Sequence, residues 1–356
     1  MRICKQCILP DCYPGISFDS DGVCNYCREN RDKKRGAVDK KKYIEDFERT
    51  VKDIKGKGKN YDCLVAFSGG KDSIYLAHLM KERYGMRILA VTIDTGFMSD
   101  IAIENAKDAI RKLDIDHIFY KPREGFYKRF YRYLFTHMAK EGTIPSICYY
   151  CGPVMDGLVL KMAVEKDIPI ILSGYGPNQP PDTSIVYEFP RSCLTKNFFS
   201  PEIFKREPFD KQDRATVWDY ERYKDKKTLP RILMPLHIFE YDEERIIEAV
   251  VQSGLVKRKR ADPIKTNCRL NWAMIYLQIK KLGYPPYLDF FSELIRAGRT
   301  SRAKYLMIFK ILSLQIKLGL FKRKEISEVF RKLGLTEEEI LNKEWSSEKR
   351  FNHRQS

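Results

Sequence analysis

The chain has 356 residues, of which 43% are hydrophobic and 32% charged, a composition typical of a globular protein with one large domain or a core domain with appendages. It contains no run of about 18 uninterrupted apolar residues, which argues against a membrane span. Its N-terminus lacks the apolar core of a secretory signal, so we expect a cytoplasmic protein. The net charge of +17 favours an anionic partner, and nucleic acid, anionic lipid and phosphorylated small molecules all satisfy it.

The N-terminal cysteines form the first motif along the chain. Ten cysteines are many for a cytoplasmic protein, where reducing conditions disfavour disulfides, so clustered cysteines are first interpreted as metal ligands or catalysts. The pairs Cys4-x2-Cys7 and Cys24-x2-Cys27 are typical of a tetrahedral zinc site. Four thiolates leave zinc no open position, so we expect a structural site, with free cysteines in a flexible tail as the alternative. Cys12 is expected to lie outside this site.

The patterning divides the chain into four parts. We expect a zinc-ribbon-like Cys4 knuckle in residues 1–30, a charged helix and linker in 31–60, an α/β domain in 61–240 and a mainly helical basic region in 241–356. In the third part, short apolar runs alternate with longer helical segments, which indicates parallel βαβ units. The predicted fold class is therefore α/β, with a parallel-sheet core flanked by the knuckle and the helical region.

Strands and helices of the α/β part can be placed along the chain. Candidate strands cover residues 62–67, 87–94, 115–120 and 168–173. Helices are expected to begin near Asp72, Ser99, Gly125 and Pro153, and further on Asp242 and Thr336 are plausible helix caps. Ligands of such sheets bind at the carboxyl ends of the strands. The predicted strand ends lie at or near Ser68, Asp94, Cys148 and Ser173.

The strongest motif is the run Phe67-Ser-Gly-Gly-Lys-Asp-Ser73, which follows an apolar strand and precedes an amphipathic helix. Gly69 and Gly70 let the backbone approach a phosphate without a Cβ clash. The amides of the first helical turn then point at the anion, aided by the helix dipole. The run is not a Walker A loop, because Val65 and Asp72 stand where that motif needs Gly and Ser or Thr. The alternative is a glycine-rich turn without a ligand.

The side chains of this loop have distinct expected roles. Lys71 adds a mobile positive charge, and Ser68 and Ser73 supply hydroxyl donors. Asp72 can cap the helix or help to hold Mg²⁺. We therefore expect Lys71 and Asp72 to be the catalytic residues and the whole loop to bind phosphate groups.

This loop resembles the PP-loop, the Ser-Gly-Gly-x-Asp-Ser signature of enzymes that split ATP into AMP and pyrophosphate. The resemblance implies ATP and Mg²⁺ as cofactors. It also implies a nucleotide contact at Asp94, in the run Val91-Thr-Ile-Asp-Thr-Gly96, and a second Ser-Gly element at Ser173 and Gly174. Taken alone, an aspartate that ends a strand is more often a turn residue, and a glycine at such a place more often a bend.

A second cysteine set consists of Cys148, Cys151 and, much later, Cys268. A pair plus one distant cysteine resembles PP-loop enzymes that thiolate tRNA, in which three cysteines hold a [4Fe–4S] cluster and one iron stays open. Zinc bound by three cysteines and one other ligand is a competing interpretation. A third interpretation has Cys148 and Cys151 packed in the core and Cys268 unrelated to them. Cys63 lies in a predicted strand and is expected to be core.

Several motifs also occur together in an order that resembles the N-acetyl sugar amidotransferases of surface-polysaccharide biosynthesis. They are the opening Cys-x2-Cys-x-Leu-Pro, a second Cys-x2-Cys, the phosphate loop, Cys-Tyr-Tyr-Cys-Gly and Thr-Asn-Cys-Arg-Leu-Asn, and they span residues 1–280. The resemblance implies that the acetamido carbonyl of a nucleotide-linked sugar is adenylated and that ammonia replaces its oxygen to give an acetamidine. It also implies a glutaminase subunit and a barrel-type ammonia-channel subunit as partners. We favour this function.

Two other functions stay open. A tRNA-thiolating enzyme would use the same adenylation with sulfur as the incoming group, and the charge would suit tRNA. The basic, aromatic stretches 127–133 and 196–211 and the run Lys257-Arg-Lys-Arg260 could then track phosphates, although solvated helix faces and core aromatics are the more common outcome for such runs. The third function is a catalytically silent scaffold that binds a partner through the zinc knuckle.

Overall fold

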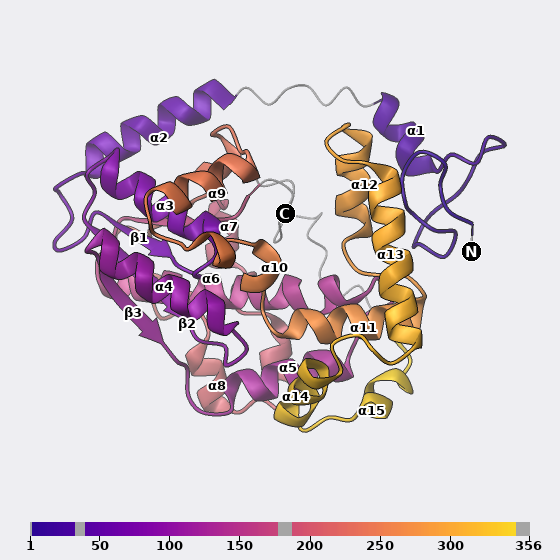
Figure 1. Cartoon of the computed structure of the whole chain (residues 1–356). Coiled ribbons are helices and arrows are strands. Elements are labelled where there is room, and N and C mark those ends of the chain that lie inside the picture. The colour runs from indigo at the N-terminus through magenta and orange to yellow at the C-terminus, as the bar shows by residue number, and fades with distance from the viewer. Residues whose placement is uncertain (1, 33–39, 177–186, 347–356) are drawn as a thin grey trace. The chain divides into compact units, whose positions relative to one another are not determined.

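The computed structural model describes residues 2–32, 40–176 and 187–346 (Figure 1). Backbone packing divides these residues into two compact units. Each unit has its own hydrophobic core, and each is described by itself below.

The first, which we call the α/β unit, takes its described residues from Asp39–Phe130 and Tyr149–Arg269. The second, the knuckle unit, takes its described residues from Met1–Val38, Tyr131–Cys148 and Leu270–Phe351. The unit that carries the sheet is thus interrupted once by a segment of the other.

A five-stranded parallel sheet forms the centre of the α/β unit, with strand order β3-β2-β1-β4-β5. Its strands are β1 (Cys63–Ala66), β2 (Ile88–Ile93), β3 (Asp116–Tyr120), β4 (Ile170–Ser173) and β5 (Arg231–Leu233). Four of them occupy the predicted places, and the parallel α/β fold class is confirmed. The edge strand β5 was not predicted, because three residues are too short a run to show a strand period.

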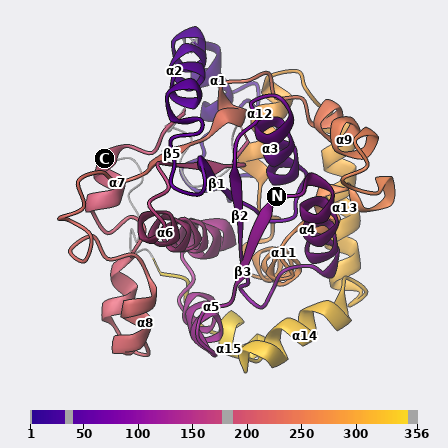
Figure 2. The ribbon, with the colours of Figure 1, turned by 90° about the vertical axis from the view of Figure 1, so that its left-hand side faces the viewer.

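Helices cover both faces of this sheet, with α3 and α4 on one side and α6 on the other (Figure 2). The helices of the unit are α2 (Lys40–Ile54), α3 (Lys71–Glu82), α4 (Asp100–Leu113), α6 (Tyr149–Glu165), α7 (Arg191–Thr195), α8 (Lys211–Thr216), α9 (Glu243–Gln252) and α10 (Pro263–Thr266). Helix α5 (Phe126–Thr136) begins in this unit and ends in the other. A sheet buried on both faces explains why its inner strands read as continuous apolar runs.

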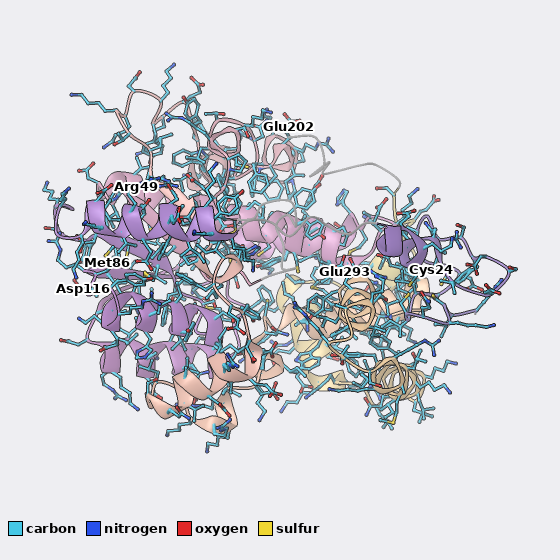
Figure 3. All side chains as sticks on the ribbon, turned by 90° about the horizontal axis from the view of Figure 1, so that it is seen from above. Cys24, Arg49, Met86, Asp116, Glu202 and Glu293 are labelled. Atoms are coloured by element: carbon cyan, nitrogen blue, oxygen red, sulfur yellow. The ribbon has the colours of Figure 1, made fainter. Side chains whose placement is uncertain are left out.

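The main core lies between the sheet and the helices α2, α3, α4 and α9. Phe47 of α2, Val65 of β1 and Ile74 of α3 are fully buried in it. Met86, labelled in Figure 3, is 2% exposed, whereas Arg49 and Asp116 of the same unit lie at the surface. Cys63 is also fully buried, as predicted for a strand cysteine. Apolar burial of this kind stabilises by about 25 cal/mol per Å² removed from water, and it fixes the sheet on which the loops depend.

Several local signals place the helix ends. Ser99 caps α4 by accepting a hydrogen bond from the amide of Ala102, and Asp242 caps α9. Thr336 forms a capping box at α15 (Glu337–Leu341). Both predicted caps, Asp242 and Thr336, are confirmed. Helix α6 begins at Tyr149, earlier than the expected start near Pro153.

The helical stretch Ile144–Glu165 is long and apolar enough to cross a membrane by length and composition, but 67% of its most apolar window is buried inside the protein. It joins the one-turn π-helix η1 (Ile144–Cys148) to α6. A mostly buried core helix passes the same test of length and hydropathy, so this stretch is weak support for a span.

The knuckle unit combines the N-terminal cysteines with the C-terminal helices, as predicted for a helical C-terminal region. Its helices are α1 (Asn25–Asp32), α11 (Leu270–Leu282), α12 (Leu288–Arg296), α13 (Arg302–Lys317), α14 (Arg323–Leu333) and α15. The four cysteines of the knuckle share one core with Tyr284 and Leu288. Cys24 and Glu293, both labelled in Figure 3, belong to this unit.

Candidate functional site

The loop between β1 and α3 is held in shape by its own hydroxyl groups. The amide of Ser68 donates to Ser73 Oγ at 3.2 Å, and the amide of Gly70 donates to Ser68 Oγ at 3.3 Å. Ser73 Oγ in turn donates to the carbonyl of Gly70 at 3.0 Å. The loop is therefore closed before any ligand arrives, as a preformed phosphate site requires.

Gly69 is required at its position by sterics. Its φ is +76°, and a Cβ there would lie 2.0 Å from the carbonyl oxygen of Ala102 on α4. At Gly70 a Cβ would meet Ser68 Oγ at 3.4 Å and Thr266 Oγ1 at 3.9 Å, which are ordinary contacts. The loop thus packs against α4 on one side and lies beside the end of α10 on the other.

Lys71 and Asp72 form a closed polar group with a distant tyrosine. Lys71 Nζ donates to Asp72 Oδ2 at 2.7 Å, and the Tyr241 hydroxyl donates to Asp72 Oδ1 at 2.9 Å. The two charged side chains are only 6% and 16% exposed. Asp72 is not the helix cap, since Gly70 occupies that place without a side-chain bond. Both of its oxygens instead accept hydrogen bonds, one from Lys71 and the other from Tyr241. Its negative charge in the first turn of α3 interacts favourably with the positive end of the helix dipole.

The predicted second Ser-Gly element lies against the start of α3. Ser173 ends β4 and stands opposite Ala66 of β1 in the sheet. A Cβ on Gly174 would lie 3.1 Å from the Cα and amide nitrogen of Ser73. The next strand after β1 lies toward one edge of the sheet, and the next strand after β4 lies toward the other edge. This pair of strands therefore marks the topological switch point of the sheet, where α/β proteins bind ligands.

Asp94 closes the turn after β2. Its carboxylate accepts a hydrogen bond from the amide of Gly96 at 2.7 Å, and its own amide donates to the Tyr120 carbonyl at 2.8 Å. The geometry is that of a turn residue, which was the ordinary alternative for this position. Asp94 nevertheless stands at the same carboxyl edge of the sheet as the phosphate loop.

Two residues of the site were not found from the sequence. Thr266 comes near Gly70 although α10 lies far along the chain. Next to it, the amide of Arg269 donates to the Phe97 carbonyl at 2.8 Å, and its Nε donates to the Met98 carbonyl at 3.2 Å. These bonds place the segment that carries Cys268 beside the loop after β2. The second missed residue is Tyr241, and no local pattern signals either contact.

The cysteines of the second set are placed individually. Cys151 lies in the first turn of α6 and is partly exposed, and Cys268 is exposed; both belong to the α/β unit. Cys148 is the last residue of η1 and belongs to the knuckle unit. Both residues of the Cys148–Cys151 pair therefore lie in helical segments, whereas the sequence pattern had placed Cys148 at or near the end of a strand. Their joint metal site is a prediction that the described residues do not test.

A group of titratable side chains surrounds Tyr127 near the start of α5. Burial raises the pKa of Tyr127, and nearby groups raise it further. Those groups are Cys151, Tyr120, Asp94 and Asp156. The carboxyl edge of the sheet thus carries a thiol, phenols and carboxyl groups next to the phosphate loop.

The four N-terminal cysteines are brought together as predicted. Within the described ranges, Cys4, Cys7, Cys24 and Cys27 are the group of metal-ligating side chains that meets, with sulfur atoms all within 4.8 Å of one another. All four are buried, and their hydrogen-bonding places the pKa of Cys7 at about 5, chiefly through Cys27. Four thiols converging on one point fit a tetrahedral zinc ion, whose charge would offset the thiolates.

The knuckle is tied to the C-terminal helices by arginines. Arg302 of α13 donates from Nε to the carbonyl of Cys7 at 2.8 Å and from Nη2 to the carbonyl of Cys4 at 2.6 Å. Arg296 of α12 places Nη1 4.0 Å from the sulfur of Cys27. The four-cysteine group is therefore anchored to α12 and α13. Cys12 is exposed and lies outside the group, as expected.

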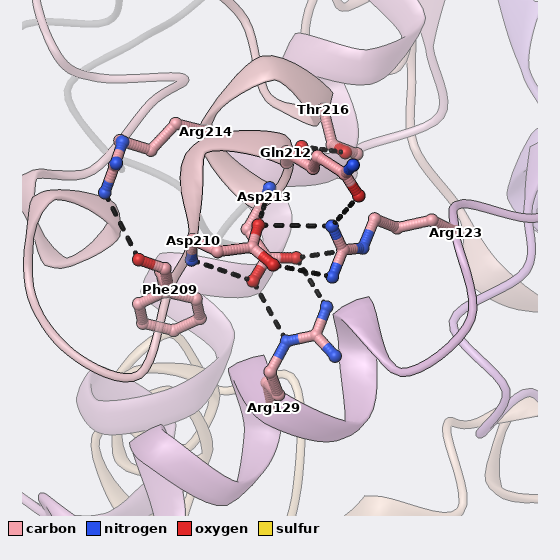
Figure 4. A network of polar contacts seen from close by, with 8 residues as sticks. All are labelled: Arg123, Arg129, Phe209, Asp210, Gln212, Asp213, Arg214 and Thr216. Atoms are coloured by element: carbon pink, nitrogen blue, oxygen red, sulfur yellow. Dashed lines mark hydrogen bonds and ion pairs between the residues drawn. The ribbon is translucent and has the colours of Figure 1, made fainter.

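The basic stretches differ in how far their side chains are exposed to solvent. Much of 127–133 is core, since Tyr127, Phe130, Tyr131 and Tyr133 are buried. Arg129 of this stretch pairs with Asp213 in a network around α8, shown in Figure 4. In the run 257–260, Arg260 is buried against α4 while the three residues before it are exposed.

Comparison with known proteins gives the superfamily. No family model matches the sequence. An uncharacterized protein of Methanocaldococcus jannaschii is 28% identical over 74% of this chain and 80% of its own length. The tRNA-specific 2-thiouridylase MnmA of Treponema denticola is 32% identical over 32% of each chain. The solved U34-tRNA thiolase NcsA of Methanococcus maripaludis, with its [4Fe-4S] cluster, covers 84% of this chain and 87% of its own at 15% identity, with a TM-score of 0.32.

The parallel sheet, the phosphate loop at its switch point and these sequence relatives define an α/β protein of the PP-loop ATP pyrophosphatase superfamily. Further tRNA 2-thiolation proteins recur among the relatives. Beyond the first relative, the chain spans less than half the length of each protein that it matches.

These relatives contradict the predicted N-acetyl sugar amidotransferase, together with its nucleotide-sugar substrate and its glutaminase and ammonia-channel partners. They support the alternative that the sequence had left open, a tRNA-thiolating enzyme. The prediction was wrong because the phosphate loop and the adenylation are common to both chemistries. The motifs therefore do not report whether nitrogen or sulfur displaces AMP.

Proposed function

We propose that this protein is an ATP-dependent sulfur transferase that converts a uridine of tRNA to 2-thiouridine through an adenylated carbonyl. The observation that carries the proposal is the meeting of two features at one edge of the sheet. The phosphate loop lies there beside Thr266, next to the segment that carries Cys268, and Cys151 lies in the first turn of α6 at the same edge. The named activities of the relatives support the choice of sulfur and tRNA.

The chemistry follows from the weakness of a carbonyl oxygen as a leaving group. Transfer of AMP to the C2 oxygen of uracil turns that oxygen into a phosphate ester, and pyrophosphate departs. Lys71 and the amides at the start of α3 would stabilise the charge of the departing pyrophosphate, with Mg²⁺ bridging the phosphates. Sulfur then replaces AMP at the activated carbon.

The positive charge of the chain supports a nucleic-acid substrate. Lys257, Arg258 and Lys259 are exposed and precede the Arg260 that anchors this segment to Glu104 and Asp108 of α4. An exposed basic run on an anchored segment of the same unit as the phosphate loop suits contact with tRNA phosphates. These three residues are therefore the tRNA contacts that we propose.

We also propose that Cys148, Cys151 and Cys268 ligate a [4Fe–4S] cluster, with zinc as the competing metal. Such a cluster would offer an open iron to the incoming sulfur. Counting iron, sulfide and zinc after purification without oxygen tests this. We expect iron and sulfide that disappear in Cys268→Ser and persist in the matched variant Cys12→Ser, whose cysteine is also exposed. Iron-free wild-type protein would contradict the cluster.

The test of the function is AMP release from Mg²⁺–ATP with bulk tRNA and sulfide, followed by mass spectrometry of the nucleosides. We expect AMP and 2-thiouridine to appear together and only with tRNA. Lys71→Ala should abolish both, whereas Lys81→Ala, at the far end of the same helix, should retain them. If anaerobic, iron-reconstituted protein releases no AMP with tRNA, the proposal fails.

A further inference from the structure

Asp156 is a buried carboxyl group that the proposed function has not yet used. It lies on α6 and is 8% exposed. Its Oδ2 accepts a hydrogen bond from the Tyr175 hydroxyl at 3.1 Å. Burial raises the pKa of Asp156 to about 7, and the bond from Tyr175 opposes this shift only in part. A carboxyl group in this state exchanges a proton near neutral pH.

The position of Asp156 connects it to the phosphate site. Tyr175 follows Ser173 and Gly174, which lie against the start of α3. The Tyr175 hydroxyl lies 3.1 Å from the place of a Cβ on Gly152, so this side chain crosses the beginning of α6 next to Cys151. One hydrogen bond therefore separates Asp156 from the loop that meets the nucleotide site.

Two phenols face Asp156 from the elements around α6. Tyr175 approaches from the loop after β4, and Tyr127 approaches from α5, where the charge of Asp156 helps to raise its pKa. Cys151 of α6 also acts on Tyr127. Among the described residues, Tyr175 is the one side chain whose hydrogen bond lowers the pKa of Asp156. No ion pair of Asp156 occurs in this part of the chain that would hold it permanently charged.

The proposed reaction needs a proton acceptor of this kind. When the C2 oxygen of uracil attacks the α-phosphorus of ATP, N3 must lose its proton so that the product is a neutral adenylate. The same proton must return to N3 when sulfur takes the place of oxygen. A group with a pKa near the working pH both accepts and returns a proton efficiently.

We propose that Asp156 takes the N3 proton of the uracil during adenylation and returns it during thiolation, an inference that rests on the proposed function. In the first step the O–P bond forms, the α–β bridging P–O bond breaks and pyrophosphate leaves. The N3–H electron pair becomes the N3=C2 π bond, and the proton passes to the Asp156 carboxylate.

In the second step hydrosulfide attacks C2, and the N3=C2 π electrons take the proton back from Asp156. The C2–O bond then breaks, AMP leaves with the former carbonyl oxygen, and loss of the S–H proton to solvent gives C2=S. The sum is uridine, ATP and hydrosulfide converted to 2-thiouridine, AMP and pyrophosphate.

Other carboxylates of the site are engaged elsewhere. Both oxygens of Asp72 accept from Lys71 and Tyr241, and Asp94 accepts from Gly96. Among the described carboxyl groups at this edge, Asp156 is the one whose hydrogen-bond partner is a single neutral phenol. The hydrogen bond from Tyr175 and the place of Tyr175 beside the phosphate loop carry the assignment, and the raised pKa of Asp156 agrees with it.

The test is single-turnover AMP formation with tRNA and sulfide as a function of pH. For the wild type we expect the rate to rise with pH and to level off above about 7, because the carboxylate is the active form. Asp156→Asn should lose this rising limb of the pH profile, and its rate should fall by at least about 100-fold. Asp156→Glu should restore part of the rate. Unchanged rate and limb in Asp156→Asn would overturn the inference.

Tyr175→Phe provides a second test that does not depend on the folding of the Asp156 variants. It removes the hydrogen bond that stabilises the carboxylate, so the limb should move to higher pH while the protein stays active. An unmoved limb would contradict the role of Asp156. Wild-type protein that thiolates tRNA while these variants behave normally would sink only this inference, whereas inactive wild type would sink the function itself.

Discussion

The hydroxyl of Tyr241 donates to Asp72 Oδ1 at 2.9 Å, although the two residues are 169 positions apart in the chain. The same hydroxyl accepts from Lys71 Nζ at 3.3 Å. Tyr241 therefore holds both charged side chains of the phosphate loop, and burial raises its pKa well above the ordinary value. It stays a neutral donor across the physiological range.

Tyr241→Phe should lower AMP formation about tenfold, because Asp72 and Lys71 lose the group that orients them. The lost hydrogen bonds should also cost about 1 kcal/mol in the free energy of unfolding. Steady-state kinetics and urea unfolding check the two effects. The matched control is Tyr61→Phe, which removes a surface hydrogen bond to Asp116 in the same unit. Equal kinetics in both variants would show that Tyr241 does not position the loop.

Gly69→Ala should unfold or inactivate the protein, because its Cβ would overlap the Ala102 carbonyl oxygen. Gly56 offers a control, since its φ of +75° is nearly the same and nothing lies within 4 Å of a Cβ there. Gly56→Ala should therefore show only the backbone strain, about 1–2 kcal/mol. Urea unfolding compares the two variants. Similar losses of unfolding free energy in the two variants would mean that α4 shifts to make room for the added methyl group.

Removal of metal should destabilise the knuckle unit. Four buried thiols without a cation repel one another once ionised, and metal binding is coupled to folding in such sites. We expect one zinc per chain by elemental analysis, and loss of that zinc with a lower Tm in Cys24→Ser. Cys12→Ser, outside the group, should keep both. Less than one equivalent of zinc in wild-type protein would contradict the site.

Asp213→Asn should destabilise the α/β unit strongly. Asp213 is fully buried and pairs with Arg129 at 2.6 Å and Arg123 at 3.5 Å, as Figure 4 shows. Loss of the buried carboxylate removes the ion pair of Arg129, whereas Arg123 keeps its pair with Asp210, and breaking a buried pair costs about 3–5 kcal/mol. Gln212→Ala, which removes an exposed acceptor of the same Arg123, should change the unfolding free energy little. Chemical denaturation measures both, and an unchanged Asp213→Asn would show that the network does not stabilise α8.

The sequence predicted much of the architecture because local patterns carry it. The apolar runs of β1 and β2 and the caps Ser99 and Asp242 are local features, and the structure has them where the patterns indicate. The four knuckle cysteines were also predictable, since short spacings in tight turns bring thiols to one point. Strand β5 was missed because three residues carry no period.

The same sequence misled where two chemistries share motifs. Both predicted functions share the phosphate loop, and both ammonia and sulfur can attack an adenylate, so this loop gave no basis for preferring the amidotransferase. The stretch 127–133 suggested nucleic-acid binding by composition, but burial of Phe130 and Tyr131 places much of it in the core. Composition does not distinguish an aromatic that stacks on a base from one that packs inside.

The sequence by itself determined the α/β class, the phosphate loop and the zinc knuckle, because each depends on residues close together in the chain. Only the tertiary structure decided that Tyr241 holds Asp72, that Thr266 lies beside Gly70 and that Asp156 is buried next to Tyr175. Such contacts form when separate elements pack on the same sheet. Their geometry depends on the burial of whole helices, and no short window of sequence encodes it.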